Sequence, residues 1–209
     1  MKNPSVLIIC GSPHEHGSTA RVLDEMIVVF KSEGVDTNLI TLGKEPVTGC
    51  VGCASCKKTG VCVFNDKVNE AAKLLEDADG LVLASPVYYA SPNGSLLAFL
   101  DRLFYSSKCD KRMKVGAAVA VARRGGLSAT FDVLNKYFTI SEMPVASSSY
   151  WNQVHGAFAE DVPEDKEGLH TVRTLARNMT FLMKAIALGK EQIGLPEREA
   201  KVFTNFTRR

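Results

Sequence analysis

The sequence lacks the long hydrophobic runs that membrane proteins need. None of its apolar stretches approaches the length of about 20 residues that spans a bilayer. The chain enters a strand-like segment within a few residues of its start and shows no pattern typical of a secretory signal. We therefore expect a cytoplasmic protein that does not associate with membranes.

Neither sign of charge dominates the sequence. The 209 residues include 25 lysines and arginines and 23 acidic residues, which gives a formal net charge of +2. The short basic stretch 108–114 and the terminal pair Arg208 and Arg209 are typical of a solvated loop and tail. The sequence therefore does not indicate a nucleic-acid surface.

Two common phosphate-binding fingerprints are absent. The chain contains no GxGxxG sequence, which argues against the usual dinucleotide site of a Rossmann fold. It also contains no GK[ST] sequence, which excludes a P-loop nucleotide-binding site. Any phosphate must therefore be bound by a different kind of loop.

Residues 6–23, VLIICGSPHEHGSTARVL, form a different kind of phosphate-binding corner. An apolar strand-like run ends at Cys10, a Gly-Ser-Pro turn follows, and a helix is predicted to begin at Ser18 or Thr19. A strand, a tight loop and a helix N-terminus together gather backbone N–H groups and the positive end of a helix dipole. The alternative is an ordinary strand-to-helix turn capped by a serine.

The rest of the chain predicts an α/β fold. Amphipathic helices alternate with five apolar segments that read as strands, at 6–10, 35–42, 80–85, 115–122 and 143–149. This alternation favours a doubly wound, five-stranded parallel sheet with helices on both faces. We expect a single domain over 1–209, with a cysteine-rich insert loop at 43–65, a last long helix over about 165–188 and a tail at 189–209.

Ligands of such sheets bind outside the carboxyl ends of the strands. Three loops are expected there, at 11–19, 86–91 and 122–126. A phosphate corner that faces a loop with proline and tyrosines suits a flat aromatic ligand with a phosphate tail. FMN fits this description.

Several motifs in this order resemble a known family. GSPHEHGSTA, CVGCASCKKTGVC, SPVYYAS, LLAFLDR, RRGG and YWNQVHG are similar to segments of the NAD(P)H-dependent FMN reductases of flavodoxin-like fold, including the multimeric flavodoxin-type quinone reductases and the iron-sulfur flavoproteins. The resemblance implies an FMN-dependent oxidoreductase that transfers electrons from NAD(P)H to a quinone, a nitroaromatic or a similar small acceptor. It also implies a homodimer or homotetramer.

The resemblance further implies which residues hold FMN. The phosphate would lie against Ser12, His14, Gly17, Ser18, Thr19 and Ala20. The isoalloxazine ring would lie against Pro86, Val87, Tyr88, Tyr89, Ala90 and Ser91, with Ala122, Arg123, Gly125 and Gly126 on its other side. The segment that carries Trp151, Asn152 and His155 could cover the open face of the flavin, and the alternative is that these residues fix the loop after the fifth strand. Hydride transfer to a flavin needs no side-chain acid or base, so we predict no catalytic residue.

Four of the six cysteines are crowded into one loop. Cys50, Cys53, Cys56 and Cys62 follow the spacing C-x2-C-x2-C-x5-C, and thiolates so spaced can wrap one metal centre. The resemblance to iron-sulfur flavoproteins implies a 4Fe-4S cluster. A four-thiolate zinc site and a set of metal-free redox thiols are the alternatives.

The cysteine loop gives the chain an alternative function. An iron-sulfur flavoprotein of this kind would be an electron carrier that passes electrons from ferredoxin through a 4Fe-4S cluster to FMN. A plain flavodoxin-like binding module is less favoured, because short flavodoxins are strongly acidic and this chain has a pI near 8.2. The adjacent Asp101 and Arg102 are expected to form a structural ion pair.

Overall fold

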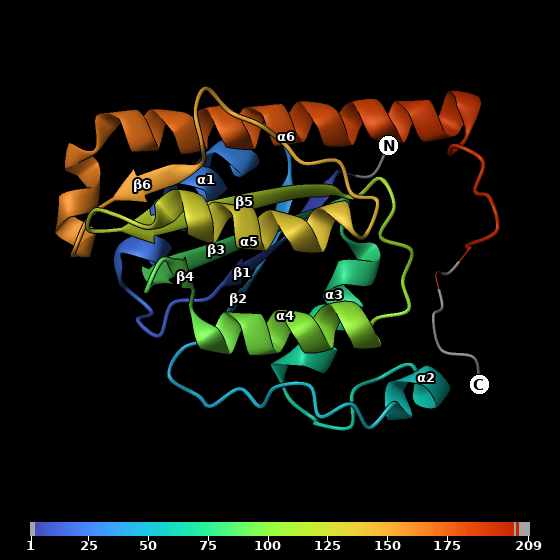
Figure 1. The fold of residues 1–209 in the computed structure, drawn as a ribbon. Coiled ribbons are helices and arrows are strands. Elements are labelled where there is room, and N and C mark those ends of the chain that lie inside the picture. The colour runs from blue at the N-terminus through green and yellow to red at the C-terminus, as the bar shows by residue number, and fades with distance from the viewer. Residues whose placement is uncertain (1–2, 203, 205–209) are drawn as a thin grey trace.

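A five-stranded parallel sheet forms the centre of the protein (Figure 1). The computed structural model describes residues 3–202 and 204. The strands lie in the order β2-β1-β3-β5-β6, and a short strand β4 pairs antiparallel with β3. Their bounds are β1 Ser5–Cys10, β2 Asp36–Thr41, β3 Gly80–Tyr88, β4 Ser91–Pro92, β5 Val115–Ala122 and β6 Gln153–His155. The prediction of a doubly wound, flavodoxin-like sheet is confirmed, and β4 adds a sixth strand.

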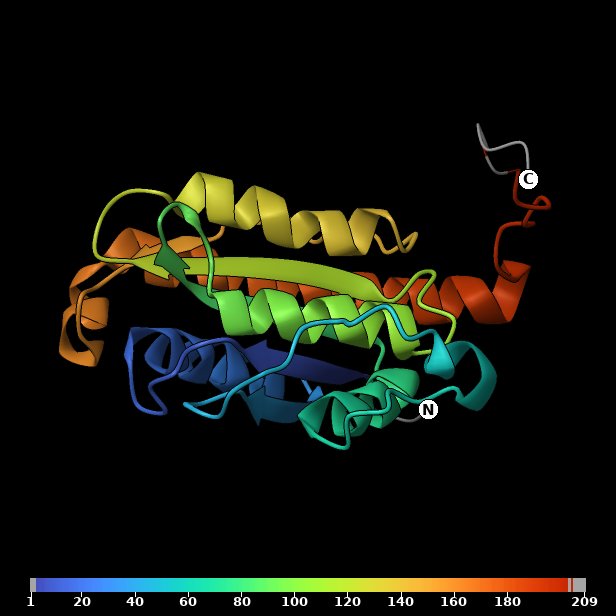
Figure 2. The ribbon, with the colours of Figure 1, turned by 60° about the horizontal axis from the view of Figure 1, so that its bottom comes forward.

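Helices cover both faces of the sheet (Figure 2). On one face lie α1 (Ser18–Ser32) and α6 (Lys166–Ile193), and on the other lie α3 (Lys67–Asp77), α4 (Gly94–Ser106) and α5 (Leu127–Thr139). Successive residues of β1 alternate between the two cores, because side chains of a strand point to opposite faces. Val6 and Ile8 pack with α1 and α6, whereas Leu7 and Ile9 pack with α3 and α4.

The last parallel strand differs from the prediction. The segment 143–149 forms only an isolated bridge between Val145 and Gly116, and β6 lies further on, within a segment expected to be a loop. Pro144 has no N–H to donate, although its carbonyl accepts a hydrogen bond from the N–H of Gly116 at 2.8 Å. The chain then leaves β5 and returns to it at Gln153, which pairs with Ala120.

Three other boundaries also differ from the sequence-based expectations. β3 continues to Tyr88, so the predicted loop 86–91 begins as a strand and turns back at Tyr89 and Ala90. The insert 43–65 contains a short helix, α2 (Ser55–Thr59). α6 continues to Ile193, into the predicted tail 189–209, of which residues 203 and 205–209 lie outside the described residues.

None of the helices within the described part of the chain is long and apolar enough to cross a membrane.

Candidate functional site

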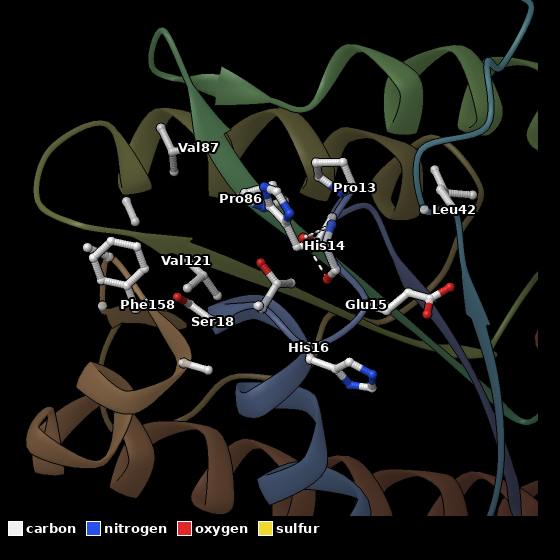
Figure 3. Close-up of a pocket in the computed structure, with 18 of the residues that line it drawn as sticks. Pro13, His14, Glu15, His16, Ser18, Leu42, Pro86, Val87, Val121 and Phe158 are labelled. Atoms are coloured by element: carbon white, nitrogen blue, oxygen red, sulfur yellow. Dashed lines mark hydrogen bonds between the residues drawn. The ribbon is translucent and has the colours of Figure 1, made fainter.

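A large pocket opens at the carboxyl ends of the parallel strands. Its volume is about 1060 Å³, and its walls come from the segments that end or follow β1, β2, β3, β5 and β6. Val87, Val121 and Phe158 lie on one side of the pocket, whereas Glu15 and His16 lie on the other (Figure 3). The pocket therefore combines an apolar side with a polar side, as a flat ring with a phosphate tail requires.

The polar side includes the N-terminus of α1. The helix begins after Gly17, and within the described chain no side chain caps it and its first turn has no acidic residue. The loop before it is fixed by Ser12, whose Oγ accepts a hydrogen bond from the N–H of His14 at 3.1 Å. Ser18 and Thr19 line the pocket, so the uncapped N–H groups of this first turn are available to an anion.

Charged side chains around the pocket are balanced in number. The lining includes Lys44, Lys67 and Arg123 against Glu15, Glu45 and Glu160. Lys67 is already engaged, because its Nζ donates to the carbonyl oxygen of Thr41 at 2.7 Å. A phosphate in this pocket would therefore depend on backbone N–H groups and the helix dipole more than on paired cations.

The apolar side is shaped by a strained hairpin. Tyr89 and Ala90, between β3 and β4, have φ values of 50° and 57°, which non-glycine residues rarely adopt. Gly126, with a φ of 89°, packs against this hairpin, and a Cβ there would lie 2.9 Å from the Cα of Ala90. The hairpin and the loop after β5 thus hold each other in place behind the pocket wall.

Most of the residues expected to bind FMN come together here. The pocket is lined by Ser12, His14, Gly17, Ser18, Thr19, Pro86, Val87, Tyr88, Ala122 and Arg123. The residues of the expected set that do not line it are Ala20, Tyr89, Ala90, Ser91, Gly125 and Gly126. Tyr89 projects fully into solvent, whereas Gly126 packs behind the wall. Trp151, Asn152 and His155 do not line the pocket either, which favours the alternative that they fix the loop after the fifth strand.

Sequence reasoning missed two segments of the pocket wall. The lining also includes Leu42, Gly43, Lys44 and Glu45 after β2, and Gly156, Ala157, Phe158, Ala159 and Glu160 after β6. Both segments directly follow parallel strands, so the rule that ligands lie at the carboxyl ends of strands could have found them. The second segment was not found in this way, because the fifth strand was expected at 143–149 and not at β6.

Two aspartates hold the segment after β6 in place. Oδ2 of Asp161 accepts hydrogen bonds from the N–H groups of Ala157 and Phe158, each at 2.9 Å. Asp165 accepts from the N–H of His155 at 2.6 Å and caps α6 through the N–H of Gly168 at 2.9 Å. Burial alone would raise the pKa of the Asp165 carboxyl, but these hydrogen bonds outweigh it and lower the pKa.

The four clustered cysteines lie elsewhere, beside α4. Cys50, Cys53, Cys56 and Cys62 all line one small cavity of about 20 Å³, together with apolar side chains and with Arg102, Tyr105 and Ser106 from α4. Cys56 is buried and Cys62 partly buried, whereas Cys50 and Cys53 are exposed. Within the described residues, no group of three or more potential ligands is arranged to hold a metal ion. The donor set nevertheless fits a thiolate-bound centre, because all four thiols border the same cavity.

Arg102 ties this loop to the body of the protein. Its guanidinium is buried and pairs with Asp66 through two hydrogen bonds of 2.6 and 2.9 Å, so the expected pair with Asp101 is wrong. Asp101 instead accepts a hydrogen bond from the hydroxyl of Tyr137 at 2.6 Å. A helical residue cannot face its own sequence neighbour, and Arg102 and Asp101 point in different directions from α4.

The strand order and the pocket define the class of protein. A parallel sheet in the order β2-β1-β3-β5-β6, with an open pocket at its carboxyl ends and an uncapped helix after β1, has the architecture of a flavodoxin-like, FMN-binding protein.

Solved structures agree on the fold. RosB with a bound flavin-derived intermediate has a TM-score of 0.69 at 13% identity over 99% of this chain and 96% of its own. An apo NADH:FMN oxidoreductase has a TM-score of 0.56 at 21% identity, over 88% of this chain and 90% of its own.

Sequence comparison narrows the class to a family. The model for NADPH-dependent FMN reductases matches residues 4–158. An iron-sulfur flavoprotein of Methanocaldococcus jannaschii is 33% identical over 87% of this chain and 98% of its own length. An iron-sulfur flavoprotein of Methanosarcina thermophila is 27% identical over 88% of this chain and 97% of its own length. The chain therefore belongs to the NADPH-dependent FMN reductase family, together with the iron-sulfur flavoproteins.

Proposed function

We propose that the protein is an FMN-dependent oxidoreductase that takes electrons from NAD(P)H and delivers them to a quinone, a nitroaromatic or a similar small acceptor. The observation that supports this proposal is the pocket at the strand ends, which joins an apolar wall to the uncapped N-terminus of α1. When bound, FMN would supply the hydride and electron-transfer chemistry. The residues of this chain would bind the cofactor, orient it and limit its exposure to water.

Each side of the pocket has a part in this proposal. N–H groups of the first turn of α1, with the hydroxyls of Ser18 and Thr19, would hold the phosphate. Val87 and Val121 would pack against the ring, and Phe158 would limit its exposure. The volume of about 1060 Å³ leaves room for a second ligand beside the cofactor, as an enzyme with two successive substrates needs.

Flavin reduction under anaerobic conditions tests this function. The protein is loaded with FMN, freed of excess cofactor and mixed with NADH or with NADPH, while the flavin absorbance is followed. We expect rapid bleaching with at least one of the two, and return of the colour when a quinone or a nitroaromatic is added. FMN-loaded protein that stays oxidised with both nucleotides contradicts the proposal.

The cysteine loop supports a second candidate function. We propose as the alternative that the chain is an electron carrier that receives electrons from ferredoxin through a 4Fe-4S cluster and passes them to FMN. Its support is the cavity bordered by all four thiols, together with the names of the related iron-sulfur flavoproteins. Protein purified without oxygen should then contain about four irons per chain. Cys53→Ser should abolish flavin reduction by ferredoxin and leave FMN bound, and a variant that behaves like the wild type contradicts this function.

A further inference from the structure

The C-terminal half of α4 contributes Arg102, Tyr105 and Ser106 to the wall of the cysteine cavity. Arg102 and Ser106 lie one helical turn apart and both line it. Ser106 is 3% exposed, and its Oγ has no hydrogen-bond partner within the described part of the chain. A buried hydroxyl without a partner is costly, so its place beside four thiols indicates a partner that arrives with a bound group.

Arg102 is oriented by a complete set of hydrogen bonds. A guanidinium has five N–H donors, and here each of them has an acceptor. Two donors bind the carboxylate of Asp66, and two bind the carbonyl oxygens of Thr48 and Phe64 at 3.2 Å. The fifth, Nε–H, donates to Sγ of Cys62 at 3.2 Å. One buried side chain thus joins the segments before and after the cysteines and aims a donor at a sulfur atom.

Cys62 is the best-anchored of the four cysteines. Its N–H donates to Oδ1 of Asn69 at 3.0 Å, and its carbonyl oxygen accepts from Nδ2 of the same residue at 3.0 Å. The ring of Phe64 lies against the guanidinium of Arg102, with 4.9 Å between Cζ and the ring centroid. Backbone and sulfur of Cys62 are therefore both fixed before any group binds.

We propose that Arg102 and Ser106 are the polar lining of a thiolate-bound iron-sulfur centre and raise its reduction potential. Arg102 positions Cys62 and donates to its sulfur, and Ser106 donates its free hydroxyl to a second sulfur atom of the centre. Hydrogen bonds to the sulfurs and a nearby positive charge favour the reduced, more negative state of such centres. This inference rests on the second candidate function and is independent of NAD(P)H oxidation.

Ser106→Ala gives the cleanest test, because it removes one oxygen atom and no known hydrogen bond. The wild type and the variant are reconstituted anaerobically with iron and sulfide, and their midpoint potentials are measured by redox titration monitored by electron paramagnetic resonance. We expect equal iron content and a potential that is more negative in the variant. Thr130→Val is the matched control, since Thr130 also has a buried, unpartnered hydroxyl but lies on α5, away from the cysteine cavity. Its potential should equal that of the wild type.

Arg102 variants test whether this side chain positions the cysteine loop in addition to raising the reduction potential. Arg102→Met should shift the potential further than Ser106→Ala and should lose part of the iron, whereas Arg102→Lys should recover part of both. Variants that lose iron while Ser106→Ala keeps the wild-type potential would show a merely structural role and overturn the proposal. A wild-type protein that takes up no iron would also overturn it. Flavin bleaching by NAD(P)H, measured on the same samples, shows separately whether the proposed reductase function holds.

Discussion

The pocket at the strand ends and the cysteine cavity are built in different ways. The pocket lies at the ends of buried parallel strands, and its polar side includes backbone groups at the start of α1. The cysteine cavity lies beside the C-terminal half of α4, and its loop is held mainly by side chains, above all Arg102 and Asn69. The two sites share no lining residue. In the ribbon, α2 of the cysteine loop lies near the C-terminal end of α4, whereas β4 leads into its N-terminal end (Figures 1 and 2).

This difference bears on how each site tolerates change. Backbone donors at a strand-to-helix corner persist as long as the fold does, whatever the side chains are. A loop held mainly by the side chains of two residues depends on those residues. The pocket should therefore withstand most single substitutions, whereas the cysteine loop should fail at a few positions. Four single substitutions test this contrast.

Replacing Arg102 should separate the two regions most clearly. Arg102→Met removes five hydrogen bonds and leaves Asp66 without its partner. Because the Asp66 side chain is 39% exposed and can be hydrated, we expect a loss of about 2–3 kcal/mol in unfolding free energy, below the usual cost of breaking a fully buried pair. Urea denaturation measures this loss, and a fluorescence titration should show unchanged FMN affinity.

Arg112→Met is the control for removal of a cation. Arg112 pairs with Asp110 at 3.0 Å near the surface, and such pairs contribute little to stability. We expect no measurable change in its unfolding free energy. If Arg102→Met weakened FMN binding as strongly as it destabilised the fold, the two regions would be coupled and the contrast would be wrong.

Two adjacent glycines test the pocket wall. Gly126→Ala places a Cβ 2.9 Å from the Cα of Ala90 and from Cγ1 of Val87, at a φ of 89°. An alanine in this left-handed conformation costs about 1–2 kcal/mol, which the loop after β5 can relieve by moving away from the hairpin. Because that movement would distort the pocket wall, we expect FMN affinity to fall by roughly tenfold. Gly125→Ala is the matched control, because a Cβ there meets no atom within 4 Å. Equal FMN affinity in the two variants would show that this packing does not shape the site.

The contrast also explains what could be predicted from the sequence. Strands β1, β3 and β5 are continuous apolar runs because both faces of the sheet are covered, so their positions follow from composition. The corner after β1 follows from the order of strand, turn and helix. β6 has three residues, only one of them buried, and its position depends on pairing with β5, which no local pattern records. The partner of Arg102 is 36 residues away, so local spacing suggested Asp101 instead.

Asp165 is a place where the pocket does depend on a side chain. It caps α6 and holds His155, next to the segment that lines the pocket. Because hydrogen bonds lower the pKa of its carboxyl in the folded protein, the stabilisation is present above the unfolded pKa of about 3.9 and is lost as the pH falls through the folded value.

Asp165→Ala should therefore lower the unfolding free energy by about 1 kcal/mol at neutral pH. The difference from the wild type should shrink as the pH falls, because the wild-type carboxyl is then progressively protonated and loses its charge-assisted hydrogen bonds. Denaturation of both proteins at about pH 7 and about pH 3 checks this expectation. Asp165→Asn keeps an acceptor for Gly168 and should lose less. A difference that stays constant down to the acid condition would show that the charge is not involved.

The smallest effect is expected at Tyr89, where the pocket hairpin stores strain. Tyr89 has a φ of 50° and a fully exposed side chain, so it gains little from packing within the chain. Asparagine adopts this left-handed conformation more readily, and Tyr89→Asn should raise the unfolding free energy by about 0.5–1 kcal/mol without changing FMN affinity. Tyr88→Asn is the control, because Tyr88 belongs to β3 and the same replacement should destabilise a strand. If Tyr89→Asn weakened FMN binding instead, the exposed ring would be part of the flavin site, and the pocket would depend on side chains as the cysteine loop does.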